Sequence, residues 1–140
     1  MIHASIDGFS RTLTYIRCAD NNRAQTVLEL FREGVLKFGL PDSVRSDHGG
    51  ENVDVWRYML AAHNNDQSCV ITGSSTHNER VERLWRDVYR CVAKIFSELF
   101  TEQERAGVLD PLNDVDIYCL HYVFLPRINQ CLLEFQEKLE

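Results

Sequence analysis

Short apolar strands alternate with amphipathic helical segments along most of this chain, after an opening pair of strands joined by a tight turn. Residues 2–7 and 12–18 read as the two strands, and Asp7-Gly8-Phe9-Ser10-Arg11 has the composition of a turn, which predicts a β-hairpin. The chain then predicts helix, strand, helix, strand and helix at residues 23–38, 43–46, 51–63, 69–72 and 78–99. Because hairpins pair antiparallel strands and crossover helices join parallel ones, this order predicts an α/β fold with a mixed sheet flanked by helices.

Residues 101–140 carry helical signals alone. A helical region begins at Asp110-Pro111, and Pro126 is expected to break or kink it before a last helix at residues 128–139. No repeat, low-complexity tract or linker marks a domain boundary. We therefore expect a single domain, with its core in residues 1–100 and a helical C-terminal extension in residues 101–140.

Charge and cysteine content restrict the partners and the compartment. The net charge is −6, whereas dedicated nucleic-acid modules are usually basic, so any DNA contact has to come from a local patch or from further domains. No apolar run approaches the roughly 20 residues of a membrane-spanning helix, and the N-terminus does not resemble a signal peptide. The five cysteines include no Cys-x-x-Cys pair, which indicates reduced thiols in an intracellular protein; Cys91 and Cys119 lie in apolar helical patterns and are expected to be buried.

Asp47 is the first candidate for chemistry. It follows the predicted strand at residues 43–46, and open α/β sheets present ligand-binding groups at the carboxyl ends of their strands. Gly49 and Gly50 would let a backbone or a substrate approach closely. The alternative is that Asp47 caps the turn before the next helix, a common role for Asp. Position alone does not separate these two interpretations.

A second acid comes from the long helix predicted at residues 78–99. At about 100° per residue, its apolar residues form one stripe, and Glu82 falls at the border between this stripe and the charged face. Glu79 falls well inside the charged face, where an ion pair with Arg83 is expected. An acid that binds metal has to reach the sheet edge and keep its oxygens in water, so Glu82 is favoured over Glu79. Together, Asp47 and Glu82 suit a divalent metal site that acts on a phosphodiester.

The charged face of the same helix carries four cations. In one interpretation this face runs along the phosphate backbone of DNA and binds it in a salt-dependent way. In the other it is the solvated side of an ordinary amphipathic helix. Because this face lies next to Glu82 on the helix, we weigh the two interpretations equally. The four cations are Arg83, Arg86, Arg90 and Lys94.

Two segments together resemble the catalytic core of retroviral and retrotransposon-type integrases. Asp47-His48-Gly49-Gly50-Glu51 is similar to the Asp-x-Gly-x-Glu segment that carries the second acid of these cores. Residues 81–86, Val-Glu-Arg-Leu-Trp-Arg, are similar to the helix that carries the third, and the separation of the acids, 82 − 47 = 35, matches the family. Residues 40–47, 71–78 and 120–129 extend the resemblance, the last two toward integrase-like proteins of animal transposons.

The resemblance implies a fold, an activity and partners. The fold is that of ribonuclease H, and the activity is DNA integration by metal-dependent polynucleotidyl transfer. It implies Asp47 and Glu82 as catalytic and metal-binding residues, Mg²⁺ or Mn²⁺ as cofactor, and DNA as partner. It further implies a nuclear location, no membrane association and possible homo-oligomers.

The start of the chain departs from this family. In integrase cores the first acid lies on the first strand. It precedes the second acid by more residues than separate Asp7 from Asp47 in this chain. Residues 6–11 instead resemble the family's second strand and turn, so we do not expect Asp7 to be catalytic. We expect the first strand and its acid to be missing, in a truncated or inactive copy. Two alternatives remain: a domesticated, non-catalytic module that binds DNA or protein, and a hydrolase of the ribonuclease H type.

Overall fold

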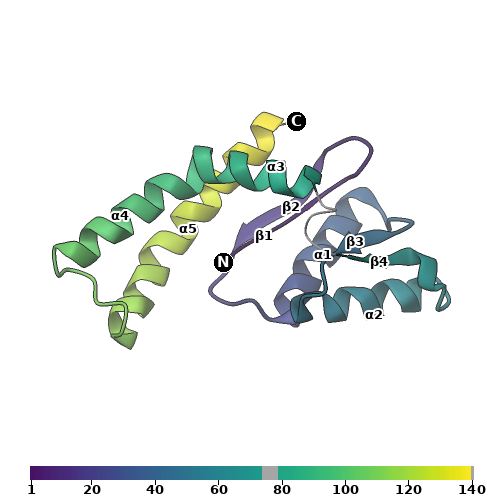
Figure 1. Ribbon diagram of the computed structural model, residues 1–140, viewed down its shortest axis with the longest axis horizontal. Helices are drawn as coiled ribbons and strands as arrows, with labels where there is room; N and C mark the ends of the chain where they lie inside the picture. The colour runs from purple at the N-terminus through teal and green to yellow at the C-terminus, as the bar shows by residue number, and fades with distance from the viewer. Residues whose placement is uncertain (74–78, 140) are drawn as a thin grey trace. The chain divides into compact units, whose positions relative to one another are not determined.

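The computed structural model describes residues 1–73 and 79–139, except for the side chains of residues 79 and 80. The chain divides into two compact units, Met1–Glu82 and Arg83–Glu140. The strands lie in the first unit, and long helices make up the second (Figure 1). The predicted start of the long helix at Asn78 lies outside the described residues.

The first unit has the predicted order of strands and helices. β1 (Ile2–Ile6) pairs antiparallel with β2 (Leu13–Cys18), and β3 (Val44–Ser46) pairs parallel with β4 (Val70–Thr72), so both kinds of pairing that the α/β prediction requires are present. Over the described residues these pairs form two separate two-stranded sheets. The remaining elements of the unit are α1 (Ala24–Phe38), the 3₁₀ turn η1 (Gly50–Asn52), α2 (Val53–Ala62) and the 3₁₀ turn η2 (Gln67–Cys69).

The core of this unit holds α1 and α2 together. Val27 and Phe31 of α1 form one buried cluster with Val55 and Met59 of α2 and with Cys69. The helical spacing of Val27 and Phe31 in α1, and of Val55 and Met59 in α2, predicts an inward face on each helix, whereas Cys69 was not predicted to join them. Ala62, the last residue of α2, is exposed. At the end of α1, Gly39 adopts φ 91° and its N–H donates to the Val35 carbonyl, as predicted for a glycine that closes a helix.

The long predicted helix is confirmed and continues past its expected end. α3 (Glu79–Val88) passes through one π turn, η4 (Tyr89–Ala93), into α4 (Lys94–Arg105). Its inward residues recur at every fourth position, from the buried Leu84, Val88 and Val92 to Phe96 and Phe100, which pack against Phe124. A pure α-helix has 3.6 residues per turn, so a spacing of four drifts around it, and the wider π turn absorbs this drift.

This change of phase corrects part of the predicted stripe. The positions that an uninterrupted α-helix would turn inward after residue 90 include Cys91, Ile95 and Leu99, and all three are exposed. The prediction that Cys91 is buried is therefore wrong, because the π turn rotates it out of the core. The same prediction for Cys119 is also wrong, since it lies on an exposed side of α5 (Asp114–Leu139).

α5 also differs from the prediction at Pro126. The proline lies inside the helix, which runs unbroken over 26 residues. Proline has no N–H to donate to the carbonyl four residues earlier, which here belongs to Tyr122. Pro126 and Tyr122 are both exposed, so water can satisfy that carbonyl and the helix can continue.

Candidate functional site

Asp47 lies on a turn that immediately follows β3. Its Oδ1 accepts two hydrogen bonds, one from the Gly49 N–H at 3.1 Å and one from the Asn52 side-chain amide at 3.1 Å. The first bond is the local turn that Asp commonly makes with the backbone two residues later. The second comes from the residue that precedes α2, so the carboxylate is tied to the helix as well as to its own turn.

The backbone of this turn is anchored by a side chain from α2. The Trp56 indole N–H donates to Ser46 Oγ at 2.8 Å, and Ser46 Oγ donates to the Asp47 carbonyl at 3.1 Å. Trp56 is half-buried, so it is not the plain core residue that its type suggests. Sequence reasoning missed the roles of Asn52, Trp56 and Ser46. The available signal was a carboxamide and an indole at the start of a helix, five and nine residues after the acid.

Glu51 folds its carboxylate back over Gly49. A Cβ at Gly49 would meet this carboxylate, which is the end of a flexible side chain, and a Cβ at Gly50 would meet nothing within 4 Å. The predicted approach of a backbone or a substrate at these glycines therefore stays a prediction. Glu51 thus brings a second carboxylate to the turn of Asp47.

The chemistry of Asp47 fits a hard divalent cation. The carboxylate is exposed, and both described hydrogen bonds end on Oδ1. A carboxylate has about four acceptor positions, so Oδ2 can serve as a metal ligand while Oδ1 holds the orientation. Mg²⁺ prefers one or two carboxylates together with water and substrate oxygens. The turn role predicted for Asp47 is thus confirmed by these hydrogen bonds, while its role as a metal ligand stays a prediction.

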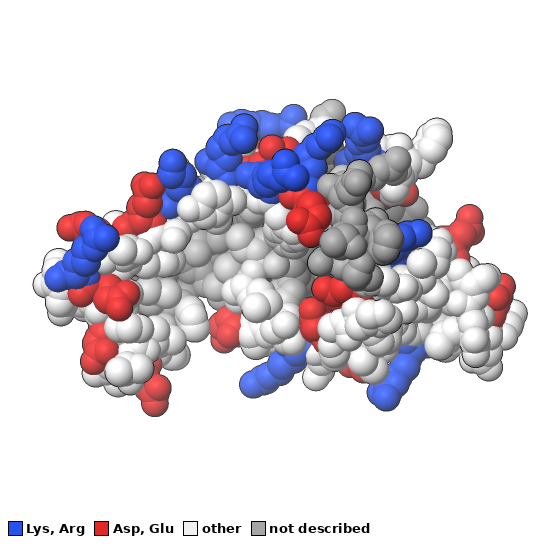
Figure 2. All heavy atoms as spheres, viewed as in Figure 1, with Lys and Arg blue, Asp and Glu red and all other residues white. Residues whose placement is uncertain are grey.

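The predicted acid and cations of the long helix are all on the surface. Glu82 of α3 is exposed, and so are the four predicted DNA-binding residues, Arg83, Arg86, Arg90 and Lys94. Figure 2 shows basic side chains gathered over α3. The ion pairs that join described residues link Arg17 with Glu33 and Arg57 with Asp54, and neither involves these cations. The predicted pair of Glu79 with Arg83 lies outside the described side chains.

The structure joins Asp47 to Asn52, which the sequence did not predict as a partner. The pairing of Asp47 with Glu82 stays a prediction, and so does a shared role for the four cations, which follow one another along α3, η4 and α4. Within residues 1–73 and 79–139, no group of three or more His, Cys, Asp or Glu residues is placed to hold a metal ion. The described residues therefore offer carboxylates suited to Mg²⁺ or Mn²⁺ without a three-acid centre.

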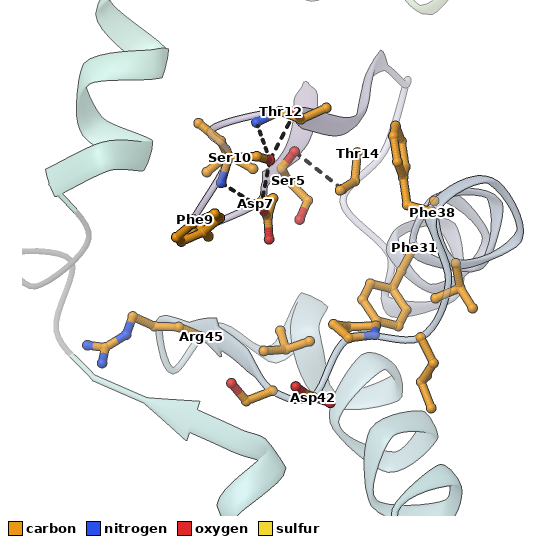
Figure 3. Close-up of a pocket in the computed structure, with 18 of the residues that line it drawn as sticks. Ser5, Asp7, Phe9, Ser10, Thr12, Thr14, Phe31, Phe38, Asp42 and Arg45 are labelled. Carbon is orange, nitrogen blue, oxygen red and sulfur yellow. Dashed lines mark hydrogen bonds between the residues drawn. The ribbon is translucent and has the colours of Figure 1, made fainter.

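Asp7 has a structural role in the hairpin. Its Oδ2 accepts hydrogen bonds from the Ser10 N–H at 2.7 Å and from Ser10 Oγ at 2.6 Å, which close the turn between β1 and β2. Figure 3 shows this turn at the edge of a groove of about 1100 Å³. β1 and the end of α1 line one part of the groove, and Val44 and Arg45 of β3 line another. These bonds are consistent with the expectation that Asp7 is not catalytic.

Within the described part of the chain, no helix combines the length and the apolar character that crossing a membrane requires.

Comparison with known proteins identifies one family. The model of the family described as integrase core domain matches residues 1–140, which is the whole chain. No curated protein and no solved structure matches the chain significantly.

Proposed function

The chain belongs to the integrase core domain family, and we propose that in its complete form it joins DNA strands by metal-dependent polynucleotidyl transfer. Asp47 and Glu82 are the proposed catalytic, metal-binding acids, with Mg²⁺ or Mn²⁺ as the cofactor. The proposed DNA contact is the basic face of the long helix, formed by Arg83, Arg86, Arg90 and Lys94. The similarity to animal transposon integrases, the nuclear location and assembly into homo-oligomers belong to the same proposal.

The observation that carries this proposal is the orientation of Asp47. The carboxylate follows a strand of a parallel pair, and the Asn52 amide and the Gly49 N–H fix its Oδ1. The carboxyl ends of parallel strands are where open α/β sheets bind their ligands. A preoriented acid at such an edge loses little freedom when it takes up a ligand.

Each proposed residue has a defined task. A divalent ion held by Asp47 and Glu82 would stabilise charge on the attacking and leaving oxygens of a phosphodiester. Asn52 keeps Asp47 oriented, and Trp56 fixes the backbone through Ser46. The four cations hold the phosphate backbone, with an affinity that falls as salt rises.

We propose further that the active core contains one more strand. β1 and β3 each have one partner strand among the described residues, and both strands line the same groove. A strand that paired with both would unite the two sheets into one. It would also satisfy backbone groups that a sheet edge leaves open, and it could carry a third acid. Without that strand, two acids suit one weakly held ion, and the chain would be a truncated or inactive copy.

The test is a strand-transfer assay on the complete form with Mg²⁺ or Mn²⁺. Asp47→Asn and Glu82→Gln keep the size of each side chain and remove its charge, so both should abolish transfer. The matched controls are Asp66→Asn, an acid with a similar turn geometry, and Glu98→Gln, an exposed acid on α4. Full transfer by either site variant would refute the proposed roles.

A second candidate function is a domesticated, non-catalytic module that binds DNA or protein. The observation that favours it is the lack of a three-acid group in the described residues. DNA binding that needs no metal and survives Asp47→Asn and Glu82→Gln would support this candidate. A metal-dependent nick would exclude it, and cleavage restricted to RNA–DNA hybrids would instead identify a ribonuclease H-type hydrolase.

A further inference from the structure

Tyr89 is an aromatic residue that the core does not use. It is 55% exposed, while Val88 beside it is 1% exposed and Val92 is 4% exposed. The two valines fill the inward side of the helix at this level, so the tyrosine ring remains on the surface. It is also the first residue of η4, and single π turns occur frequently at functional sites.

Tyr89 lies between two exposed arginines. Arg86, on α3, precedes it by three residues, so the two side chains are neighbours on the helix surface, and Arg90 is the next residue of η4. Glu82 precedes it by seven residues, or two helical turns, so the ring shares a side of the helix with the proposed catalytic acid.

The charge around the ring is opposite in sign to that of the whole chain. Residues 79–94 contain five cations and three acids, a net charge of 5 − 3 = +2, whereas the whole chain carries −6. A locally positive surface attracts phosphates. An exposed aromatic ring in such a surface adds a face on which a nucleic-acid base can stack. In a duplex the bases stack on one another, so the ring finds a partner where a base is unpaired.

We propose that Tyr89 stacks on an unpaired DNA base while Arg86 and Arg90 contact the adjoining phosphates. The preferred ligand of this surface is then single-stranded DNA, or a duplex end with unpaired nucleotides, rather than blunt duplex DNA. This proposal rests on the proposed function, because it uses the same basic face, and it names the class of DNA that this face selects.

The test compares two DNA probes and a set of surface variants of the full chain. The probes are a short fluorescent oligothymidine and a blunt duplex of the same length, at low salt. Tyr89→Ala should weaken binding to the oligothymidine by about 5- to 150-fold, the range typical for loss of one base stack, and leave duplex binding nearly unchanged. Tyr89→Phe keeps the ring and should bind normally, whereas Tyr89→Leu keeps bulk without an aromatic face and should bind like Tyr89→Ala.

The control variant is Tyr118→Ala. Tyr118 is another exposed tyrosine of the same unit, 69% exposed on α5, and lies outside the basic helix. Circular dichroism verifies the fold of each variant. Equal binding of oligothymidine by Tyr89→Ala and Tyr118→Ala would overturn the stacking proposal.

Failure of the proposed function has a different signature. The double variant Arg86→Gln, Arg90→Gln should weaken binding of both probes, since both contain phosphates. If the double variant binds both probes normally, or if the unaltered chain binds neither probe, the basic face is not a DNA contact. Both the DNA contact and the stacking proposal are then refuted. If the double variant binds both probes more weakly while Tyr89→Ala binds both normally, the basic face contacts DNA and only the stacking proposal is refuted.

Discussion

The turn at Asp47 and the turn at Asp66 are built alike but lie at opposite ends of strands. Each aspartate accepts a hydrogen bond from the backbone N–H two residues later, at Gly49 and at Ser68. Asp47 follows β3, whereas Asp66 precedes β4, the strand that pairs parallel with β3. Ligands bind at the carboxyl ends of parallel strands, and of these two aspartates Asp47 is the one that lies at such an end.

The second donor to each carboxylate sharpens this difference. At Asp66 it is the hydroxyl of the same Ser68, at 2.8 Å, so both bonds stay within one turn. At Asp47 it is the amide of Asn52, which belongs to the next element. A turn that only caps a segment needs no support from a neighbouring helix. Capping a turn and orienting a carboxylate are therefore separate tasks, and the second donor to the carboxylate distinguishes them.

The largest expected difference between the turns concerns metal affinity. Asp47→Asn should lower Mn²⁺ affinity by more than the roughly 100-fold that loss of an outer partner of a metal site can cost. Asp66→Asn should leave the affinity unchanged, because Asp66 lies at the other end of its strand. Titration of each variant with Mn²⁺, followed by electron paramagnetic resonance, measures both. Equal affinities of the two variants would show that Asp47 contributes no more to metal binding than Asp66 does.

Removing the shared support should affect both turns. Met59 is 0% exposed and belongs to the cluster that joins α2 to Cys69, so it supports the helix after the first turn and the segment after the second. Met59→Ala should reduce the free energy of unfolding by about 2–5 kcal/mol, the usual range for such a truncation in a core. Urea unfolding monitored by fluorescence measures this loss. Leu36→Ala is the control, since Leu36 is exposed on α1, and an equal loss there would contradict the assignment of the core.

The supporting donors provide the next prediction. Asn52→Ala leaves Asp47 with the Gly49 N–H as its described donor and should reduce Mn²⁺ affinity by about 10- to 100-fold. Ser68→Ala removes the matching side-chain donor at Asp66 and should not change Mn²⁺ affinity. Asn22→Ala, at an exposed position before α1, controls for loss of a carboxamide. An affinity for Asn52→Ala equal to that of Asn22→Ala would show that Asn52 does not position Asp47.

Helices and strands whose apolar residues recur at regular spacing could be predicted from the sequence. The hairpin, the helices that bury Val27, Phe31 and Met59, and the strand that leads to Asp47 were all predicted and are confirmed. Such elements follow from local patterns of apolar residues and from turn residues at their ends. The burial of Cys91 and a helix break at Pro126 were predicted wrongly, because a π turn and a solvated carbonyl alter the ideal helix in ways that apolar spacing does not reveal.

The candidate site was predictable only in part, because spacing along the chain does not specify how its elements pack. The position of Asp47 at a strand end follows from the pattern of strands and glycines. The bonds from Asn52 to Asp47 and from Trp56 to Ser46 depend on how α2 packs beside β3, which spacing along the chain does not specify. The roles of Glu82 and of the four cations remain predictions, because their surface positions are compatible with solvation and with binding.

The smallest expected effect comes from the pH dependence of the Asp66 turn. The Ser68 N–H, followed by the Ser68 hydroxyl, lowers the pKa of Asp66 below its ordinary value of 3.8, and nearby His63 acts in the same direction. A lowered pKa in the folded state means that the ionised carboxylate stabilises the fold. This contribution is complete above the pKa of the unfolded chain and is lost as pH falls from 3.8 through the lower folded value.

Ser68→Ala should therefore raise the pKa of Asp66 only part of the way to its ordinary value, because the backbone donor remains. Asp66→Asn should remove this contribution to acid unfolding and leave the rest of the acid transition in place. Carbon-detected NMR titration of the carboxyl group follows the first change, and acid unfolding by circular dichroism follows the second. A pKa of Asp66 that stays fixed in Ser68→Ala would mean that the backbone bond alone holds this turn. The side-chain donors would then distinguish the two turns even more sharply, since Asn52 would be the one that orients its acid.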